Sequence, residues 1–223
     1  MNIQNEKIRN LIAWYRKFIP DYAHLPLILC FFTNLFAFTI PRIVNVPTVI
    51  DLSIAFDAKI PLIPATSYIY IGAFAYWALS YIAVSRRGRK LTWRIFWADA
   101  IGKLVAFICF MLIPCHIVQP ETSEITGVGA WLLKLVYFFD EPNNLFPSIH
   151  CFVSWMCFRA LIDKEVHGIP LYVKILSFVF TMLICISTLT TKQHVFADTF
   201  TGVILAEAGW ILSKFIVKRV QES

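Results

Sequence analysis

Two short polar segments carry the residues of this sequence that are best suited to chemistry. The first, residues 144–150, ends in Pro-Ser-Ile-His, and the second, residues 190–198, contains His194 and Asp198. Side chains four residues apart lie on one face of a helix, so the Asp198 carboxylate can hold one ring nitrogen of His194 and direct the other at a substrate. An imidazole that is oriented in this way is a candidate nucleophile.

The residues around the two histidines favour phosphoryl transfer. We expect Ser148 to cap a helix that begins directly after Pro147, which leaves free backbone N–H groups and the positive end of the helix dipole as an anion site. Lys192 adds a cation beside His194. His150 can then protonate a leaving alkoxide, a role worth about 10²–10⁴ in rate. The sequence contains no evident metal-ligand cluster, and this mechanism requires no metal or other cofactor.

Transmembrane helices are the elements that must position these residues. Of the 223 residues, 58% are apolar and only 15% are charged, whereas soluble domains carry about 25% charged residues. Crossing the hydrocarbon core takes about 20 mostly apolar residues in a helix. The apolar runs of the sequence predict six such spans, at about 24–44, 61–84, 96–118, 148–166, 171–190 and 195–216.

Two further segments predict helices that do not cross the membrane. Residues 128–139 are apolar but too few to span it, so we expect a short interfacial helix between spans three and four. Residues 1–20 combine basic and apolar side chains at helical spacing, which predicts an amphipathic helix on the cytoplasmic surface. The sequence therefore predicts an all-α membrane protein in which residues 1–223 form a single membrane domain.

The basic residues indicate how the spans are oriented. Most of the 20 Lys and Arg residues fall in the N-terminal segment, after spans two and four, and at the C-terminal end. Cytoplasmic loops keep such an excess, so we expect a multi-pass protein of the cell membrane with both termini in the cytoplasm. The fourth span then runs inward and the fifth returns outward, which brings His150 and His194 to the same extracytoplasmic face. Because the net charge of +6 comes from these clusters, the expected partner is the lipid bilayer and not nucleic acid.

Each motif alone also has an ordinary structural interpretation. Pro-Ser-x-His arises often by chance, and His-x-x-x-Asp is usually a satisfied pair on a helix. We favour a functional interpretation of the two motifs together. Few ionisable groups lie at the span ends, and those of both motifs are expected on the same side of the membrane.

Ionisable residues inside the spans predict structural pairs. Asp99 and Lys103 are four residues apart and are expected to pair. Glu207 lies at a depth similar to that of Lys103, so we also expect these two side chains to meet. An unpaired charge at mid-helix costs about 2.5–3.5 kcal/mol, which favours such contacts.

The two motifs resemble those of the type 2 phosphatidic acid phosphatase superfamily, six-span membrane lipid phosphatases and phosphotransferases related in fold to vanadium haloperoxidases. The second family motif, Pro-Ser-x-His, matches residues 147–150, and the third, Ser-Arg followed by a spaced His and Asp, is similar to residues 187–198. The resemblance covers most of the chain from the third span onward. It implies that His194 forms a phosphohistidine supported by Asp198. It also implies that His150 is the general acid and that Ser148 helps to bind phosphate.

The sequence departs from this family pattern at two arginines. The first family motif ends in Arg-Pro, whereas the equivalent position here is Gln119, and Thr188 replaces the Arg of the third motif. Two missing guanidinium groups weaken bidentate phosphate binding. We expect Lys192 to compensate, together with His116, and Gln119 to lie at the phosphate site.

The sequence therefore predicts an enzyme that hydrolyses a lipid phosphate or diphosphate at the outer leaflet through a phosphohistidine. The substrates that the resemblance implies are phosphatidic acid, phosphatidylglycerol phosphate and polyprenyl diphosphate. One alternative is a lipid phosphotransferase that moves a phospho-headgroup to an acceptor alcohol. A second is a non-catalytic lipid-binding or transport protein. The sequence ranks neither the substrates nor the oligomeric states.

Overall fold

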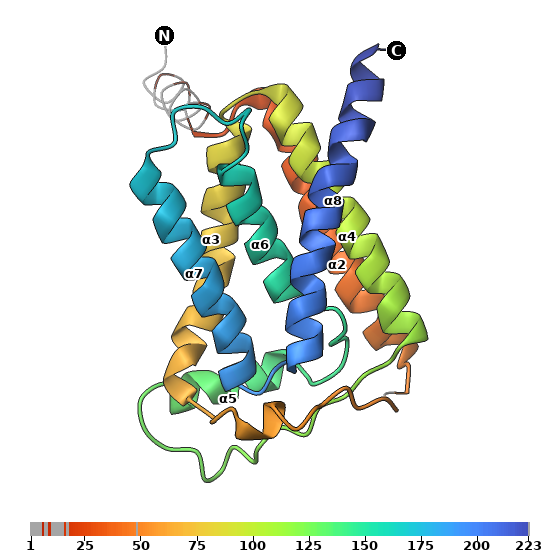
Figure 1. The fold of residues 1–223 in the computed structure, drawn as a ribbon, viewed down its shortest axis with the longest axis vertical. Helices are drawn as coiled ribbons and strands as arrows, with labels where there is room; N and C mark the ends of the chain where they lie inside the picture. Colours follow the sequence, from red (N-terminus) through yellow and green to blue (C-terminus); the bar gives the residue numbers. More distant parts are fainter. Residues whose placement is uncertain (1–5, 7–8, 10–15, 17, 48, 223) are drawn as a thin grey trace.

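The chain is a bundle of helices with one end covered by shorter segments, as Figure 1 shows. The computed structural model describes residues 6, 9, 16, 18–47 and 49–222, and for 219–222 the backbone only. The expected amphipathic helix of residues 1–20 therefore lies almost entirely outside the described residues. The longer described helices are α2 (His24–Val44), α3 (Ser67–Ser85), α4 (Arg89–Leu112), α5 (Ala130–Phe139), α6 (Ile149–Leu161), α7 (Leu171–Thr190) and α8 (Phe196–Glu222). The short 3-10 helices are η1 (Asp21–Ala23), η2 (Asp57–Lys59) and η3 (Pro64–Thr66).

Five helices in the described part of the chain are long and apolar enough to cross a membrane. They include α2, α3, α4, α7 and α8, and each overlaps one of the expected spans. Their outer faces carry large exposed apolar side chains, among them Phe31, Phe32 and Phe36 on α2, Leu176 and Val179 on α7, and Phe200, Ile204 and Ile211 on α8. So much exposed apolar surface is unusual for a protein in water and suits a lipid environment.

The expected span at 96–118 is wrong at both ends. α4 begins at Arg89 and ends at Leu112. Pro114 follows, and a proline both lacks the N–H that a helix needs and disfavours helical geometry in the residue before it. At the other end, the basic residues Arg89, Lys90 and Arg94, which the sequence predicts to lie in a loop, form the first turns of α4.

The expected span at 148–166 is also shorter in the structure. α6 contains 13 residues and ends at Leu161. Beyond it, Asp163 Oδ1 accepts the backbone N–H of Glu165 at 2.9 Å, a local turn that competes with helix continuation. At about 1.5 Å per residue, α6 is roughly 20 Å long, well below the length of a full span.

A helix does form where the interfacial helix is expected. α5 covers Ala130–Phe139, close to the expected range of 128–139. Figure 1 shows it lying across one end of the bundle. Its place at the covered end brings its C-terminus near the start of α6.

The two expected pairs inside the bundle have different outcomes. The Asp99–Lys103 pair is confirmed, with Lys103 Nζ at 2.8 Å from Asp99 Oδ2. The Lys103–Glu207 contact is wrong, because Lys103 Nζ donates to the Cys30 carbonyl at 3.1 Å and Glu207 pairs with Arg159. Lys103 faces α2 and Glu207 faces α6, so helix packing and not depth decides which charges meet.

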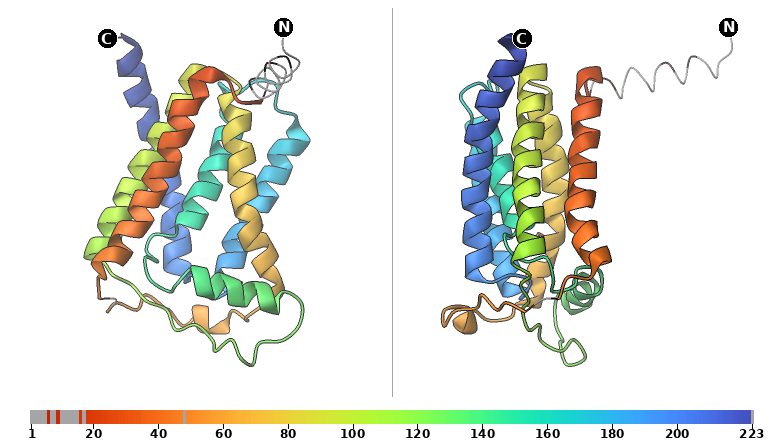
Figure 2. Two further views of the ribbon diagram at one scale, coloured as in Figure 1. Left: turned by 180° about the vertical axis from the view of Figure 1, so that it is seen from behind. Right: turned by 90° about the vertical axis from the view of Figure 1, so that its right-hand side faces the viewer.

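α6 lies at the centre of the bundle, where α3, α4, α7 and α8 pack around it (Figure 1). Most of its side chains are buried, including Phe152 and Met156, which join Ile95 and Trp210 in the main core cluster. Two views in Figure 2 show that the start of α2 and the end of α8 lie at the end opposite the cover. The start of α6 lies at the covered end.

The cover consists of the connections between α2 and α3 and between α4 and α5. Ile50 and Cys115, one in each connection, form an isolated β-bridge. Asp57 is buried, and its Oδ1 accepts the backbone N–H of Phe196, the first residue of α8, at 2.8 Å. The cover therefore holds the turn between α7 and α8 in place.

Gly202 allows α8 to cross the start of α6 at close range. A Cβ at this position would lie 2.5 Å from the Ser148 carbonyl oxygen and 3.2 Å from Cys151 Cβ. Because a backbone carbonyl cannot move aside as a flexible side chain can, we expect Gly202→Ala to destabilise the fold by about 1–3 kcal/mol. The measurement is the melting temperature of the purified protein in detergent.

Gly72→Ala is the matched control for this substitution. Gly72 also lies within a helix, but its added Cβ would meet only the ring tip of Phe180, at 3.3 Å. Alanine is favoured over glycine inside a helix by roughly 0.5–1 kcal/mol, which offsets a mild contact. A Gly202→Ala protein that melts no lower than Gly72→Ala would contradict the close approach of the two helices.

Candidate active site

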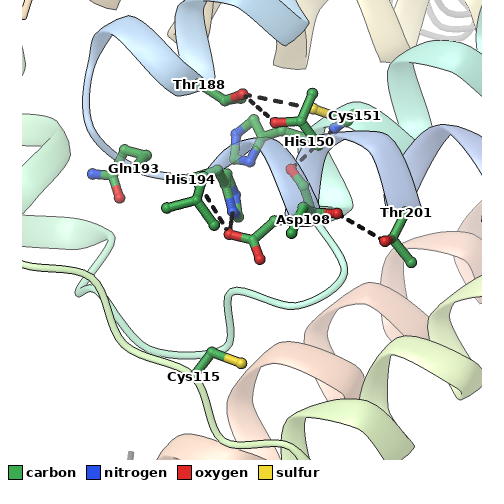
Figure 3. A network of polar contacts seen from close by, with 12 residues as sticks. Cys115, His150, Cys151, Thr188, Gln193, His194, Asp198 and Thr201 are labelled. Atoms are coloured by element: carbon green, nitrogen blue, oxygen red, sulfur yellow. Dashed lines mark hydrogen bonds and ion pairs between the residues drawn. The ribbon is translucent and has the colours of Figure 1, made fainter. Parts of the chain in front are cut away.

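His194 and Asp198 meet where α8 begins, as the sequence predicts (Figure 3). Asp198 lies in the first turn of α8, and its Oδ2 accepts the Val195 backbone N–H at 3.1 Å and lies 3.3 Å from Nδ1 of His194. An ionised carboxylate only accepts hydrogen bonds, so Nδ1 of His194 carries the proton and Nε2 carries the lone pair. Both side chains are buried.

The turn between α7 and α8 is built by backbone hydrogen bonds. The N–H groups of Gln193 and His194 both donate to the Thr188 carbonyl, at 3.0 and 3.1 Å. Lys192 has a φ of 54°, the left-handed conformation that lets the chain reverse within a few residues. The reversal places the His194 ring beside the first turn of α8.

Two opposing effects act on the pKa of His194. Burial lowers the pKa because it removes the imidazolium from water, whereas the hydrogen bond and the negative charge of Asp198 raise it. The net pKa of His194 lies above its ordinary value. Asp198 therefore makes the ring more basic as well as orienting it.

Ser148 connects the start of α6 to the start of α8. Its Oγ accepts the Cys151 backbone N–H at 3.3 Å, which caps α6 as expected. Its own N–H donates to the Asp198 carbonyl at 3.1 Å. This link sets the spacing between the segments that carry the two histidines.

The rings of His150 and His194 lie together, with their centroids 6.4 Å apart (Figure 3). His150 is enclosed by the aromatic rings of Tyr70, Phe74 and Trp77. Its Nε2 is buried and has no hydrogen-bond partner among the described residues. Buried polar atoms normally have partners, so this nitrogen has a hydrogen-bonding capacity that the described residues leave unused.

Each histidine lines its own cavity. His150 lines a cavity of about 430 Å³ whose walls are mainly apolar side chains of α2, α3, α5 and α6. His194 lines a second cavity, of about 240 Å³, which has Lys192 and Asp57 in its wall. The two cavities share no lining residue among those described, although the two rings that line them have centroids 6.4 Å apart.

Lys192 is placed beside His194, in the wall of the same cavity. Its Nζ donates to the backbone carbonyls of Asp57 and Ile60, at 3.1 and 2.6 Å. An ammonium group has three donors, so these two carbonyls leave one N–H of Lys192 unused.

His116 and Gln119 lie in the connection between α4 and α5, close to this cavity. The His116 backbone N–H donates to the Ile50 carbonyl at 3.0 Å, and Gln119 Nε2 donates to Gln193 Oε1 at 3.2 Å. Neither is among the described residues that line the cavity at His194. The structure therefore places these two expected phosphate ligands beside the wall of this cavity and not in it.

Sequence reasoning missed three residues around His150. Tyr70 places its hydroxyl oxygen 3.3 Å from Nδ1 of His150 and 2.5 Å from Oδ2 of Asp140. Arg42 Nη2 lies 3.2 Å from Oδ1 of the same carboxylate. Arg42 and Asp140 are among the few charged residues on the expected outer side, which was the one signal in the sequence that pointed to them.

The described residues contain no group of three or more His, Cys, Asp or Glu side chains that could hold a metal ion. The site itself offers imidazole, carboxylate, hydroxyl and ammonium groups. Comparisons of the chain with protein-family models, with curated proteins and with solved structures found no match.

Proposed function

We propose that this protein is an integral membrane lipid phosphatase that acts through a phosphohistidine on His194. The observation that carries the proposal is a pair of buried imidazoles with centroids 6.4 Å apart, one held by a carboxylate and the other with an unpaired Nε2. A nucleophile with an orienting partner and a separate proton donor are the groups that double displacement at phosphorus requires. The resemblance of both motifs to the type 2 phosphatidic acid phosphatase superfamily supports the same function.

The reaction proceeds in two balanced steps. First, Nε2 of His194 attacks phosphorus and the bond from phosphorus to the leaving oxygen breaks; that oxygen keeps the electron pair and takes a proton from protonated His150. Water then attacks the phosphohistidine and gives its proton to His150, while the P–N bond breaks and returns its electron pair to His194. Inorganic phosphate leaves, and both histidines regain their starting states.

Positive charge at the site comes from a lysine and from helix ends. Lys192 offers its remaining N–H from the cavity wall at His194. α6 and α8 both begin at the site, and the positive ends of helix dipoles favour a phosphate there. Lys192 and the two helix ends thus supply positive charge of the kind that two arginines supply in the family pattern.

The proposed membrane arrangement has six spans, with α6 as the fourth. α6 is short, but other helices enclose it, and non-helical backbone at membrane depth is tolerated where protein surrounds it. The excess of basic residues around the junction of α3 and α4 and near both ends of the chain supports a cytoplasmic location for both termini. The histidine pair then lies at the extracytoplasmic face of the cell membrane.

The larger cavity supports a lipid as the substrate. Its walls include Phe38 of α2, Phe74 of α3 and Leu135 of α5, and its polar end is formed by His150 and Asp140. An apolar pocket with a few convergent polar groups at one end suits an amphiphile whose headgroup reaches the histidines. A phosphate ester with a hydrocarbon chain fits this distribution of polarity.

A lipid phosphotransferase is the second candidate function. The separate cavity at His194 offers room for an acceptor other than water. In that case an alcohol, and not water, attacks the phosphohistidine and leaves with the phosphoryl group.

Phosphate release from lipid vesicles tests the proposal and separates the two candidates. We expect the purified protein to release inorganic phosphate from vesicles that contain phosphatidic acid, phosphatidylglycerol phosphate or polyprenyl diphosphate. Addition of glycerol leaves the yield of inorganic phosphate unchanged for a hydrolase, whereas a transferase forms glycerol phosphate at its expense. If none of the three lipids yields either product, the enzyme proposal is rejected and the lipid-binding or transport alternative stands.

A further inference from the structure

A second carboxylate, Asp140, lies near the histidine pair and is joined to His150 through Tyr70. It follows α5 directly, and its Oδ2 accepts the hydrogen bond of the Tyr70 hydroxyl at 2.5 Å. Its other oxygen, Oδ1, pairs with Arg42 Nη2 at 3.2 Å. Arg42 is fixed in turn by Asn143, whose Oδ1 accepts from Arg42 Nε at 3.1 Å. Both oxygens of Asp140 are therefore engaged, and the carboxylate has a defined orientation.

Tyr70 joins this carboxylate to His150. The Tyr70 oxygen lies 3.3 Å from Nδ1 of His150, and the two rings are stacked with centroids 4.1 Å apart. A phenol has one proton, and a carboxylate can only accept, so the Tyr70 proton points at Asp140. The Tyr70 oxygen is left as an acceptor facing His150, and Nδ1 of His150 is the donor.

This arrangement determines which nitrogen of His150 faces the reaction. With Nδ1–H directed at Tyr70, Nε2 is the remaining ring nitrogen, and it is the one that is buried without a partner among the described residues. His150 also lines the apolar cavity, with Asp140 beside it. The ring that carries the unpaired nitrogen therefore forms part of the cavity wall.

We infer that Tyr70 and Asp140 are positioning residues that hold His150 as the proton donor for the leaving oxygen. The inference rests on the proposed phosphatase function and adds two residues that no sequence motif contains. As the P–O bond breaks, its electron pair stays on the leaving oxygen, and the proton on Nε2 of His150 moves to that oxygen. The negative charge of Asp140, transmitted through the Tyr70 hydroxyl, stabilises the protonated ring before the transfer.

The two histidines are thus supported in different ways. His194 contacts its carboxylate directly at 3.3 Å, whereas His150 reaches its carboxylate through a tyrosine. Direct contact suits a nucleophile that must be electron-rich. An intervening hydroxyl, together with Arg42 on the far side of Asp140, moderates the charge at His150 and leaves its proton easier to donate.

The test compares two phosphate esters that differ in their need for an acid. The leaving group of dodecyl phosphate is a strongly basic alkoxide that needs a proton, whereas para-nitrophenyl phosphate loses a weakly basic phenolate. We expect Asp140→Asn to lower kcat about 10²-fold for the alkyl ester but less than about threefold for the aryl ester, because only the first depends on general acid catalysis. Tyr70→Phe is expected to show the same selective loss.

Glu124→Gln is the matched control, since it makes a carboxylate-to-amide change at an exposed position in the connection between α4 and α5, outside this network. It is expected to leave both rates near wild type. Equal losses on the two esters for both Asp140→Asn and Tyr70→Phe, or no loss for either, overturn the inference. If Asp140→Asn does not yield folded protein, judged by its melting curve, Tyr70→Phe decides the outcome by the same ratio.

Failure of the proposed function has a different signature. In that case the wild-type protein releases no phosphate from either ester, or His194→Ala releases it as fast as the wild type. If the wild type is active and depends on His194, but the Asp140 and Tyr70 variants show no selective loss, the proposed function stands. Only the positioning role of Tyr70 and Asp140 is then refuted.

Discussion

Replacing His194 with alanine is expected to lower kcat/KM for a lipid phosphate by about 10⁴-fold or more, the scale on which loss of a covalent nucleophile acts. Water cannot take over this role, because Asp198 is arranged to support an imidazole and is itself buried. The methyl group of alanine fits within the space of the ring, so the fold is expected to persist. Phosphate release from phosphatidic acid vesicles measures the effect.

The control for His194→Ala replaces a histidine at the opposite end of the bundle. His167 is an exposed histidine in the connection between α6 and α7, remote from the start of α6. His167→Ala is therefore expected to retain wild-type turnover. A labelled substrate adds a direct readout: acid-labile phosphate should be trapped on the wild-type protein and on His167→Ala but not on His194→Ala. A His194→Ala protein within about tenfold of wild type would exclude the phosphohistidine mechanism.

Local patterns in the sequence predicted the parts of the fold that depend on local forces. Apolar runs located α2, α7 and α8 because a span must remain apolar over its whole length. Hydropathy did not predict the ends of α4, because the helix ends before Pro114 and begins among the basic residues near position 90. It failed again at α6, where a turn at Asp163 ends the helix before the apolar run does.

The same distinction holds within the candidate site. The His194–Asp198 pair was predictable because both residues belong to one short segment and their spacing alone places them together. The contact between Tyr70 and Asp140 joins residues that are far apart in the chain and depends on how α3 packs against α5. No spacing rule connects those positions. The expected Lys103–Glu207 pair failed for the corresponding reason, because similar depth in a membrane does not say which helix faces which.

The positions of His116 and Gln119 show a further limit. The sequence aligns Gln119-Pro120 with the end of a family motif, which suggests a place at the phosphate. In the structure, the connection that contains them does line the cavity at His194, but through Ile117, Val118 and Pro120 and not through His116 or Gln119. Loops have no internal periodicity, so their side-chain directions depend on partners that only the folded chain supplies.

Asp198→Asn is expected to lower kcat about 10³-fold to 10⁴-fold while leaving the fold intact, as removal of the orienting carboxylate from a histidine does in other enzymes. The asparagine oxygen can still accept the Val195 N–H, so the start of α8 keeps its cap. What is lost is the charge that fixes the proton on Nδ1 of His194 and makes the ring basic. Glu124→Gln, which changes an exposed carboxylate in the connection between α4 and α5 to an amide, is the matched control and is expected to have no effect.

The pH profile distinguishes this role from a purely structural one. Asp198 raises the pKa of His194 above its ordinary value. As the pH falls through that raised pKa, His194 gains a proton on Nε2 and can no longer attack phosphorus, so the acid limb of kcat/KM reports its protonation. Without the carboxylate the ring is less basic, and the acid limb of Asp198→Asn should move to lower pH even though its maximum is much reduced. An acid limb that stays in place or moves to higher pH would show that His194 is not the group whose neutral form reacts.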